Sequence, residues 1–357
     1  MIFKTFNANT DIILNQSKIL AKGIWSGDSP TLTTFYTGSA QTAIQKTYFY
    51  QVWDDVSTAS GSQSQFAVAY GHRLGSGSAT SATDDEATKA IYSQMKLTVL
   101  NPGDVLFTFN SGSVVTESNS IYVLSINRAR LKDSLDPGNW SLTLATLSGS
   151  KVPNSVHTGS NVKVNGLGTV VSLIDDSQIT TGSVTISNAG TKYNIVSGTV
   201  AGGPYVGSGG YHYYGIVYPA LGLMVFNGNE LDRNVGFNTV TGSQVAGDNA
   251  FKLFTSISGA AAISTTNAFT ARNNEKRVSN SYFVRAFSNE FNYSNNPTFV
   301  TGSQGLIRPE FVGDPQTFIS TIGLYNNTNE LLAVAKVSRP LIKNFETELL
   351  VKVRLDY

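Results

Sequence analysis

The final residues of the chain, LLVKVRLDY at positions 349–357, alternate between apolar and polar side chains. Successive side chains of a β-strand point to opposite faces, so Val351, Val353, Leu355 and Tyr357 share one face and the charged residues share the other. The pattern predicts a half-buried strand that reaches the last residue, with Tyr357 buried in phase with the three aliphatic side chains. We expect this strand to be held inside its own domain or against a neighbouring subunit.

Two further patterned segments precede the final strand. Residues 317–325 and 331–338 each have the composition of a strand, and the sequence NNTN between them is typical of a turn. Together with residues 349–357 they predict an antiparallel, three-stranded meander.

The middle of the chain, residues 138–229, is almost free of charge. Its charged residues are Lys151, Lys163, Asp175, Asp176 and Lys192. Short apolar runs, such as GTVVSLI, YNIVSGTV and LGLMVF, recur through it with Gly, Asn or Ser between them. This spacing predicts an all-β domain of the sandwich or barrel type.

Two segments have the pattern of a helix. In TDDEATKAIYSQMKLTVL (83–100), Thr83 and Glu86 have the spacing of a capping box, and Asp84 and Asp85 suit the positive end of the helix dipole. The apolar stripe expected on this helix consists of Ala87, Ala90, Ile91 and Met95. DNAFKLFTSI (248–257) predicts a shorter helix capped by Asp248.

These sequence patterns predict a mainly β, multi-domain fold with short antiparallel strands of the sandwich or meander type and one or two short helices. The expected parts are an N-terminal β arm (1–60), a mixed α/β segment (61–137), a low-charge all-β domain (138–229) and a C-terminal β domain (230–357) that ends in the meander. Within the second part, SIYVLSI (120–126) predicts a buried strand, and Pro137-Gly138 predicts a turn that ends that part.

The composition of the chain argues against several classes of function. Charged residues make up 14% of the chain and the net charge is +1, so no basic footprint for nucleic acid or an anionic membrane is present. The chain has no cysteine, which excludes disulfides and thiolate metal sites. No apolar run has the length of a membrane-spanning helix, and MIFKTFNANTDIIL at the N-terminus lacks the apolar centre of a signal peptide. We expect neither membrane insertion nor export.

Glycine-rich and tyrosine-rich segments are the first candidates for a binding site. AYGHRLGSGS places His72 and Arg73 among glycines after a strand, an arrangement that could cradle an anion, but it lacks the Lys and Ser/Thr of a phosphate loop. A plain turn is the favoured interpretation. GGPYVGSGGYHYYG (202–215) contains Tyr211 and Tyr213, which could form an assembly interface or a sugar platform, or could simply lie on a half-buried strand face.

The ionisable residues give weaker evidence for a functional site than these two segments. His72, His157 and His212 are far apart and have no acidic neighbour in sequence, so no metal site or catalytic triad is expected. Asp84-Asp85 and Asp175-Asp176 are adjacent carboxylates, which a glycosidase could use, but helix capping and a turn explain them as well. Arg128, Arg130 and Lys132 form a basic cluster for which a solvated face or a salt bridge to a partner protein is favoured over phosphate binding. We expect no catalytic residue, metal or cofactor.

Several segments resemble virion structural proteins of large contractile-tailed bacteriophages, including cyanophages. The resemblance is carried by FAVAYGHRLGSGS, TKAIYSQ, IYVLSINRARLKDSLDPGNW, YGIVYPALG, FNYSNNPTF and, most strongly, the last 50 residues from GDPQTFISTIGLY to VRLDY. It implies a tail or baseplate-wedge protein, made in the host cytoplasm and located in the virion. It implies no catalytic residues.

The expected function is therefore structural: assembly with other tail or baseplate subunits in a three- or six-fold symmetric array, without nucleic acid. Uncharged polar surfaces and free strand edges suit such contacts. The alternative is a receptor- or glycan-binding β protein of a tail fibre, and a polysaccharide-degrading enzyme is a third hypothesis that only the carboxylate pairs support. The candidate assembly residues are Arg128, Arg130, Tyr211, Tyr213, Tyr325, Val353, Leu355 and Tyr357.

Overall fold

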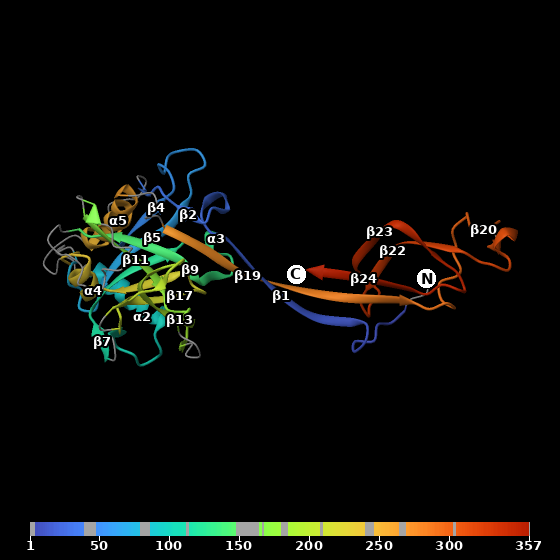
Figure 1. Ribbon diagram of the computed structural model, residues 1–357, viewed down its shortest axis with the longest axis horizontal. Coiled ribbons are helices and arrows are strands. Elements are labelled where there is room, and N and C mark those ends of the chain that lie inside the picture. The colour runs from blue at the N-terminus through green and yellow to red at the C-terminus, as the bar shows by residue number, and fades with distance from the viewer. Residues whose placement is uncertain are drawn as a thin grey trace. The chain divides into compact units, whose positions relative to one another are not determined.

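The structure is a computed structural model of the whole chain (Figure 1). The residues that it describes are 4–38, 48–78, 86–111, 114–147, 164–165, 168–179, 185–207, 210–239, 246–263, 269–302 and 305–356. The chain divides into two compact units, a larger one of Leu20–Glu275 and a smaller one of Met1–Ile19 with Lys276–Tyr357. Strands from all four parts expected from the sequence pattern pair in the same sheet.

The boundaries between the two units fall inside strands. Strand β1 (Ile12–Gly23) and strand β19 (Phe269–Ala286) each contribute residues to both units.

The larger unit is built on one long antiparallel sheet. Its strands follow the order β19-β9-β11-β13-β17-β18-β8-β5-β4-β3, and the strands from β9 to β18 in this order come from the low-charge middle of the chain. The bounds of these strands are β3 Tyr36–Thr37, β4 Phe49–Trp53, β5 Ser64–His72, β8 Ser120–Ile126, β9 Ser134–Ala145, β11 Gly168–Asp175, β13 Gly190–Thr199, β17 Tyr213–Tyr218 and β18 Leu223–Asn227.

Short strands extend or flank this sheet. They are β2 Thr31–Leu32, β10 Val164–Asn165, β12 Thr185–Ser187 and β14 Gly203–Pro204, and separate hairpins are formed by β6 Phe107–Ser111 with β7 Val114–Ser118 and by β15 Val206–Gly207 with β16 Gly210–Tyr211. The predicted strands SIYVLSI, GTVVSLI, YNIVSGTV and LGLMVF are all confirmed. The strand β8 is buried at nearly every position, as an apolar run without alternation predicts.

Both faces of the central strands are covered. On one face, helix α5 (Ala246–Ile263) packs against β4, β5 and β9, and its Leu253 and Ile257 join a core with Phe66, Tyr122 and Leu142. On the other face lie helix α2 (Ala87–Val99) and strand β6, whose apolar side chains form a second core. Its members include Tyr92, Val99, Phe107, Phe109, Val123 and Val225. Alternate residues of β8 therefore point into two different cores.

The helices differ from the expectation in number and in their ends. The described residues contain four α-helices: α2, α3 (Arg128–Leu131), α4 (Gly228–Asn234) and α5. Helix α2 begins after Glu86, which occupies the N-cap without a side-chain cap, so the predicted capping box is wrong. Its buried stripe includes Tyr92 and Val99, whereas Ala90 is exposed. Helix α5 begins at Ala246, so Asp248 lies within it. Thr83, Asp84 and Asp85 lie outside the described residues.

The turn predicted at Pro137-Gly138 is wrong, because both residues lie within β9. Gly138 has a φ of 74°, a left-handed conformation that glycine adopts readily and that suits a β-bulge. Its N–H donates to the side-chain carboxylate of Asp175 on β11 rather than to a backbone carbonyl of a neighbouring strand. A side chain therefore takes the place of the missing ladder hydrogen bond, and the strand continues.

The smaller unit contains two antiparallel arrangements. Strand β24 (Leu349–Asp356) pairs with β19 from Ser279 to Ala286, and β22 (Thr317–Tyr325) pairs with β23 (Leu331–Lys343) in a two-stranded sheet. A short hairpin and two 3₁₀ turns complete the elements of the chain: β20 Val300–Thr301, β21 Leu306–Ile307, η3 Pro309–Phe311 and, in the larger unit, η1 Ser26–Asp28.

The predicted meander is therefore wrong in its third strand. The two strands β22 and β23 form the expected hairpin, but the last strand pairs with β19, which lies far back in the sequence. Within β24, Val353 is buried and Val351 and Leu355 are half-buried, as the alternation predicts. Tyr357 lies outside the described residues. The prediction of a mainly β fold with short antiparallel strands is confirmed.

Candidate functional site

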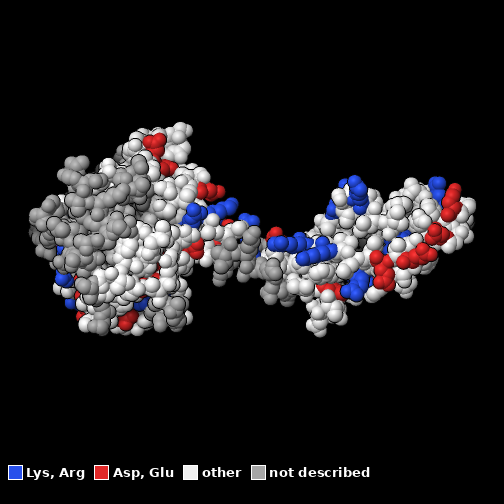
Figure 2. Space-filling view, viewed as in Figure 1, with Lys and Arg blue, Asp and Glu red and all other residues white. Residues whose placement is uncertain are grey.

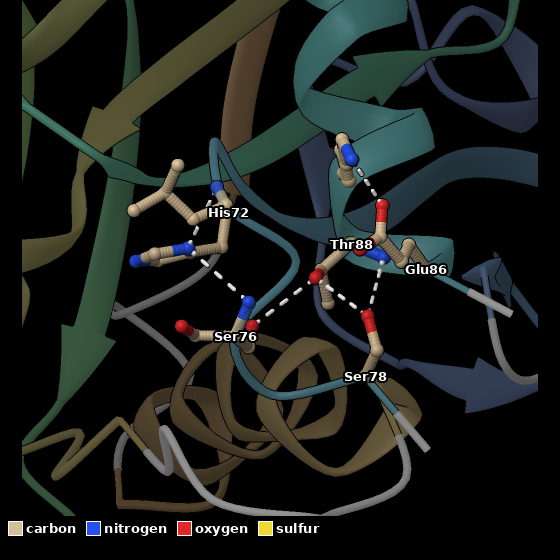
Figure 3. Close-up of polar contacts among 7 residues, drawn as sticks. His72, Ser76, Ser78, Glu86 and Thr88 are labelled. Carbon is tan, nitrogen blue, oxygen red and sulfur yellow. Dashed lines mark hydrogen bonds and ion pairs between the residues drawn. The ribbon is translucent and has the colours of Figure 1, made fainter. Parts of the chain in front are cut away.

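The glycine-rich segment after β5 is a turn closed by its own histidine (Figure 3). The imidazole Nδ1 of His72 accepts hydrogen bonds from the backbone N–H groups of Leu74, at 3.2 Å, and Ser76, at 3.3 Å. Burial, with a smaller contribution from the charge of Arg73, lowers the pKa of His72. A neutral ring with an acceptor at Nδ1 is the form that this turn requires.

The same turn also occupies the start of helix α2. The Oγ of Ser78 accepts from the backbone N–H of Thr88 at 3.2 Å and lies 2.8 Å from its hydroxyl. The hydroxyl of Thr88 donates in turn to the carbonyl of Ser76 at 3.1 Å (Figure 3). Together with the bonds to His72, these bonds use the backbone N–H groups of Leu74, Ser76 and Thr88, so the structure favours the plain turn over the anion cradle.

A close approach of helix and strand explains Gly71 in the same segment. A Cβ at this position would lie 2.9 Å from the backbone nitrogen of Tyr92 on α2. The helix can pack this closely on β5 only where the strand has no side chain.

Asp175 is a fully buried carboxylate surrounded by donors. It accepts from the backbone N–H of Gly138 with both oxygens, at 3.0 and 2.9 Å, from the Nε1–H of Trp140 at 2.5 Å and from the backbone N–H of Ser177 at 3.0 Å. Burial raises the pKa of Asp175, although these hydrogen bonds oppose the shift. The carboxylate joins β11 to the bulge of β9.

The neighbouring carboxylate also binds the backbone of the sheet. Asp176 accepts from the backbone N–H of Asn194 at 2.9 Å and from its side-chain amide at 2.7 Å. Both members of the pair thus hold strands of the same sheet together. This geometry gives the pair a structural role and removes the reason for assigning it to glycoside hydrolysis.

Sequence reasoning missed one polar cluster. The Nε2 of His212 lies 3.0 Å from Glu230 Oε2 and 2.8 Å from Asn234 Nδ2, and the same amide donates to Glu230 at 2.7 Å. Burial would raise the pKa of Glu230, but the hydrogen bond and charge of His212, with Arg233 and Asn234, hold it below the ordinary value. The cluster joins the residue before β17 to helix α4.

The register of a hairpin could have revealed this cluster. Strands β17 and β18 are joined by the short turn PALG, and Gly215 pairs with Phe226. Continuing the same antiparallel register places His212 opposite the first turn of α4, where Glu230 lies. A histidine and a carboxylate 18 residues apart are therefore neighbours because of a turn that the sequence displays.

The two tyrosines and the basic cluster lie at different places in the larger unit. Tyr211 pairs with Val206 in the β15–β16 hairpin, and Tyr213 begins β17; both side chains are half-buried. Burial raises the pKa of Tyr213, with smaller contributions from Asp176 and Tyr211. No feature of these contacts identifies a sugar site.

Helix α3 carries the basic cluster. The guanidinium of Arg128 donates to the carbonyls of Asp133, at 3.3 Å, and Ala220, at 3.4 Å. The Nε of Arg130 is enclosed without a hydrogen-bond partner, and Lys132 forms an ion pair with Glu275 at 3.8 Å. The three basic side chains are thus directed to different surroundings and do not form one phosphate-binding surface.

Within the described ranges, no three His, Asp or Glu side chains gather in a group that could hold a metal ion. His157 lies outside those ranges. In the part of the chain that the structure describes, no helix is long and apolar enough to cross a membrane.

The smaller unit has almost no core of its own. Its buried hydrophobic residues, among those described, are Ala286, Phe299, Leu324 and Val353. By contrast, most of the exposed large hydrophobic side chains of the described chain belong to this unit, although it holds less than a third of the residues. Exposed apolar surface of this extent is typical of sites where proteins make contacts.

The β22–β23 hairpin carries a large part of this apolar surface. Directly opposed residues of an antiparallel pair lie on the same face. One face is buried or half-buried and consists of Thr317, Ile319, Ile322, Leu324, Ala333, Ala335, Leu341 and Lys343. The other face is exposed and is called the hairpin face below; it consists of Phe318, Thr321, Gly323, Tyr325, Leu331, Val334, Lys336 and Ile342.

Tyr325, one of the predicted assembly residues, lies on this hairpin face. A Cβ on Gly323 would lie 2.8 Å from the Tyr325 ring and 3.2 Å from the side chain of Leu331. The two side chains thus cover the glycine and form a continuous apolar end to the hairpin. Val353 and Leu355, the other described assembly candidates of this unit, belong instead to the inward side of β24.

A buried lysine anchors the opposite end of the hairpin. Lys343 is fully enclosed, and its ammonium group donates to the carbonyl of Ser288 at 2.9 Å, the side-chain oxygen of Asn292 at 2.8 Å and the carbonyl of Asn344 at 2.7 Å. Burial lowers the pKa of Lys343, against the opposing charges of Glu290 and Glu348. All three donors have partners, so the charge is used to fix the hairpin in its unit.

Comparison of the chain with protein-family models, with curated proteins and with solved structures finds no match.

Proposed function

We propose that this chain is a structural subunit of a virion, located in the tail or baseplate of a contractile-tailed bacteriophage, and that it acts through protein–protein contacts. Its partners are other tail or baseplate subunits in a three- or six-fold symmetric array. The sequence resemblance supports the virion, and the surface of the smaller unit supports the contacts. The tail or baseplate position rests on the resemblance alone.

The main support for the assembly role is that the smaller unit buries few of its hydrophobic side chains and exposes many of them. An isolated two-stranded hairpin is marginal in water, because it needs a third strand or another layer to bury its apolar side chains. Here Phe318, Leu331, Val334 and Ile342 are about half exposed or more, at 59%, 53%, 58% and 49%. Another chain packed on them would remove this apolar surface from water.

The strand edges support the same role. Within the described residues, β22 and β23 pair only with each other, so each has one free edge. Such edges favour unwanted association in a free protein and serve as docking sites in an assembly. The long bulge in β23 between Lys336 and Leu341, which contains Pro340, interrupts its edge and restricts docking to the two ends of the hairpin.

The test is to find the chain in purified particles. Mass spectrometry of gradient-purified virions should detect it, with a copy number that is a multiple of three or six. Two double variants test whether the hairpin face is needed for incorporation. The test variant carries Leu331→Asp and Val334→Asp on the hairpin face. The control carries Val114→Asp and Val115→Asp on the exposed strand β7 of the larger unit. We expect only the hairpin-face variant to be lost from particles. Particles that lack the wild-type chain would refute the proposal.

A further inference from the structure

The outer edge of β22 lacks the features that normally protect the edge of a sheet. Within the described residues, no backbone–backbone hydrogen bond joins residues 317–324 to any segment other than β23. The nine residues of β22, TFISTIGLY, include no charged residue and no proline, whereas β23 carries Lys336, Arg339 and Pro340. Charged residues and proline keep strand edges from pairing with other chains. The edge of β22 is therefore the one to which a strand of another chain can add.

The alternation of side chains along β22 is interrupted at its centre. We call a side chain inward if it is buried or half-buried and outward if it is exposed. From Thr317 to Leu324 the side chains are, in order, inward, outward, inward, outward, outward, inward, outward and inward. The two consecutive outward residues are Ser320 and Thr321, at the bulge where the register with β23 shifts. A regular strand alternates strictly, so along this edge it would match the faces of only one half of β22.

The order of faces in residues 317–324 reads the same in both directions. An antiparallel second copy of β22, with a two-fold axis between Ser320 and Thr321, therefore places inward residues opposite inward residues and outward residues opposite outward ones. The opposed pairs, each formed twice, are Thr317 with Leu324, Phe318 with Gly323, Ile319 with Ile322, and Ser320 with Thr321. Such a contact is isologous, since each copy uses the same strand. The interruption that a regular strand cannot follow is thus matched by a second copy of β22.

The side chains nearest this axis are suited to each other. On the inward side, Ile319 lies opposite Ile322 of the other copy, and β-branched side chains pack well against cross-strand neighbours. On the outward side, Ser320 lies opposite Thr321 of the other copy, a pair that favours a hydrogen bond between hydroxyls. No like charges meet, because β22 has no charged residue. On the face in view in Figure 2, the part that holds β22 and β23 likewise shows uncharged surface between groups of charged side chains.

Pairing of two copies supplies the strands that each hairpin lacks. An isolated two-stranded hairpin is marginal in water, and three or more strands with a hydrophobic face are needed for independent stability. Two copies of the β22–β23 sheet joined at β22 form one continuous sheet in the order β23-β22-β22-β23. Its two outer strands are then the ones that carry charge and proline, so the dimer has protected edges and does not extend further.

We propose that the chain forms a symmetric dimer through antiparallel pairing of β22 with β22 of a second copy, with the two-fold axis between Ser320 and Thr321. The inference rests on the proposed function in taking the smaller unit as the part that makes contacts. It goes further in identifying one partner, which is a second copy of the chain, and the register of the contact.

Charged variants of the full-length chain at the axis test this pairing. One variant carries Ser320→Lys and Thr321→Lys, and the other carries Ser320→Glu and Thr321→Glu; both positions are exposed. The matched control, Asn327→Lys with Ser338→Lys, adds the same charge at two exposed positions of the same hairpin outside β22. Circular dichroism checks that each variant folds. Sedimentation velocity at micromolar concentrations measures the oligomeric state of each protein alone and of an equimolar mixture of the two axis variants.

We expect the wild-type chain and the control to sediment as dimers. Each axis variant alone should dimerise at least about tenfold more weakly, because like charges then lie directly opposite each other at the axis. The equimolar mixture of the two axis variants should form a one-to-one dimer, because every opposed pair at the axis then carries opposite charges.

Disulfide crosslinking tests the register. The chain has no cysteine, so each single substitution introduces one unique thiol. Under mild oxidation, a mixture of Ser320→Cys and Thr321→Cys chains should form a mixed disulfide, because directly opposed residues of an antiparallel pair lie within reach of such a bond. A mixture of Ser320→Cys and Asn327→Cys chains should form none, because position 327 lies beyond the paired residues. Mass spectrometry of the crosslinked peptides distinguishes the two cases.

Four results would overturn the inference: a monomeric wild-type chain, axis variants that dimerise as strongly as the control, a mixture of axis variants that stays monomeric, or crosslinking from position 320 that is as efficient to 327 as to 321. The failure of this inference can be distinguished from that of the proposed function. A monomeric chain that is still found in purified virions overturns the dimer alone, and a dimeric chain that is absent from virions overturns the virion role alone.

Discussion

Replacing Asp175 with alanine should destabilise the larger unit by about 3 kcal/mol. The substitution leaves two enclosed donors without an acceptor, the N–H of Gly138 and the Nε1–H of Trp140. Each unsatisfied buried donor costs roughly 1–3 kcal/mol. The release of a buried carboxylate, whose pKa is raised by burial, offsets part of this cost. The expected net loss is a large fraction of the stability of a typical domain.

Urea unfolding followed by circular dichroism measures this loss. With a denaturant dependence of about 3 kcal/mol per molar for a unit of this size, the midpoint should fall by about 1 M. Asp104→Ala is the control, since Asp104 is exposed and accepts one hydrogen bond from Asn101 within a turn. Its stability should change by no more than about 0.5 kcal/mol.

A double-mutant cycle isolates the bond between the carboxylate and the indole. Trp140→Phe removes the Nε1–H donor and keeps an aromatic ring in the core. The coupling between Asp175→Ala and Trp140→Phe should be about 1–2 kcal/mol, because the indole donor has no acceptor once the carboxylate is gone. A loss below about 1 kcal/mol for Asp175→Ala, or additive effects of the two substitutions, would refute the structural role assigned to this carboxylate.

Four further predictions concern other residues. His72→Asn should flatten the dependence of melting temperature on pH below 6.5, because the lowered pKa of His72 gives stability that is present above 6.5 and lost as the pH falls through the folded-state pKa; parallel melting curves for both proteins would contradict this. Lys343→Met should cost about 2 kcal/mol and speed hydrogen exchange of β22–β23, whereas unchanged exchange would show that the ammonium group is not an anchor. Deletion of residues 355–357 should speed hydrogen exchange of the β19 amides that pair with β24, whereas unchanged exchange would show that the last residues do not stabilise this pairing. Tyr211→Ala and Tyr213→Ala should leave a glycan array as free of hits as the wild type, and a hit lost in either variant would revive the glycan-binding alternative.

Local pattern was sufficient to predict most of the strands. The runs SIYVLSI and LGLMVF are mainly apolar and do not alternate, and both form central strands with two covered faces. The alternation of VKVRL at the chain end likewise predicted which side of β24 is buried. In each case the information lies in consecutive side chains, which a strand sorts to its two faces.

Partners across long separations could not be predicted in this way. Strand β24 pairs with β19 rather than with the adjacent hairpin, and its alternation suits either partner. Helix α5 extends from Ala246 to Ile263 and is longer than the expected helix at both ends. Its Gly-, Ala- and Ser-rich second half could not be predicted as helical, because it has no clear amphipathic pattern. The role of Asp175 depends on a bulge in β9 that was expected to be a turn. These features arise from tertiary contacts, which the local sequence does not specify.

The hairpin face was only partly visible in the sequence. Tyr325 was selected as an assembly residue, but Phe318, Val334 and Ile342 were not, because both faces of β22 and β23 contain apolar residues. The register of the two strands separates the faces, and the exposed fractions then show which of the two is uncovered.

Above all, we propose that this chain is an assembly subunit whose smaller unit makes the contacts. A cryo-electron microscopy map of purified particles, with this chain located in it, tests that claim most directly. We predict density for another protein chain against Phe318, Val334 and Ile342 of the hairpin face. A particle in which the chain is present but this face borders only solvent, or in which the chain is absent, would contradict the account.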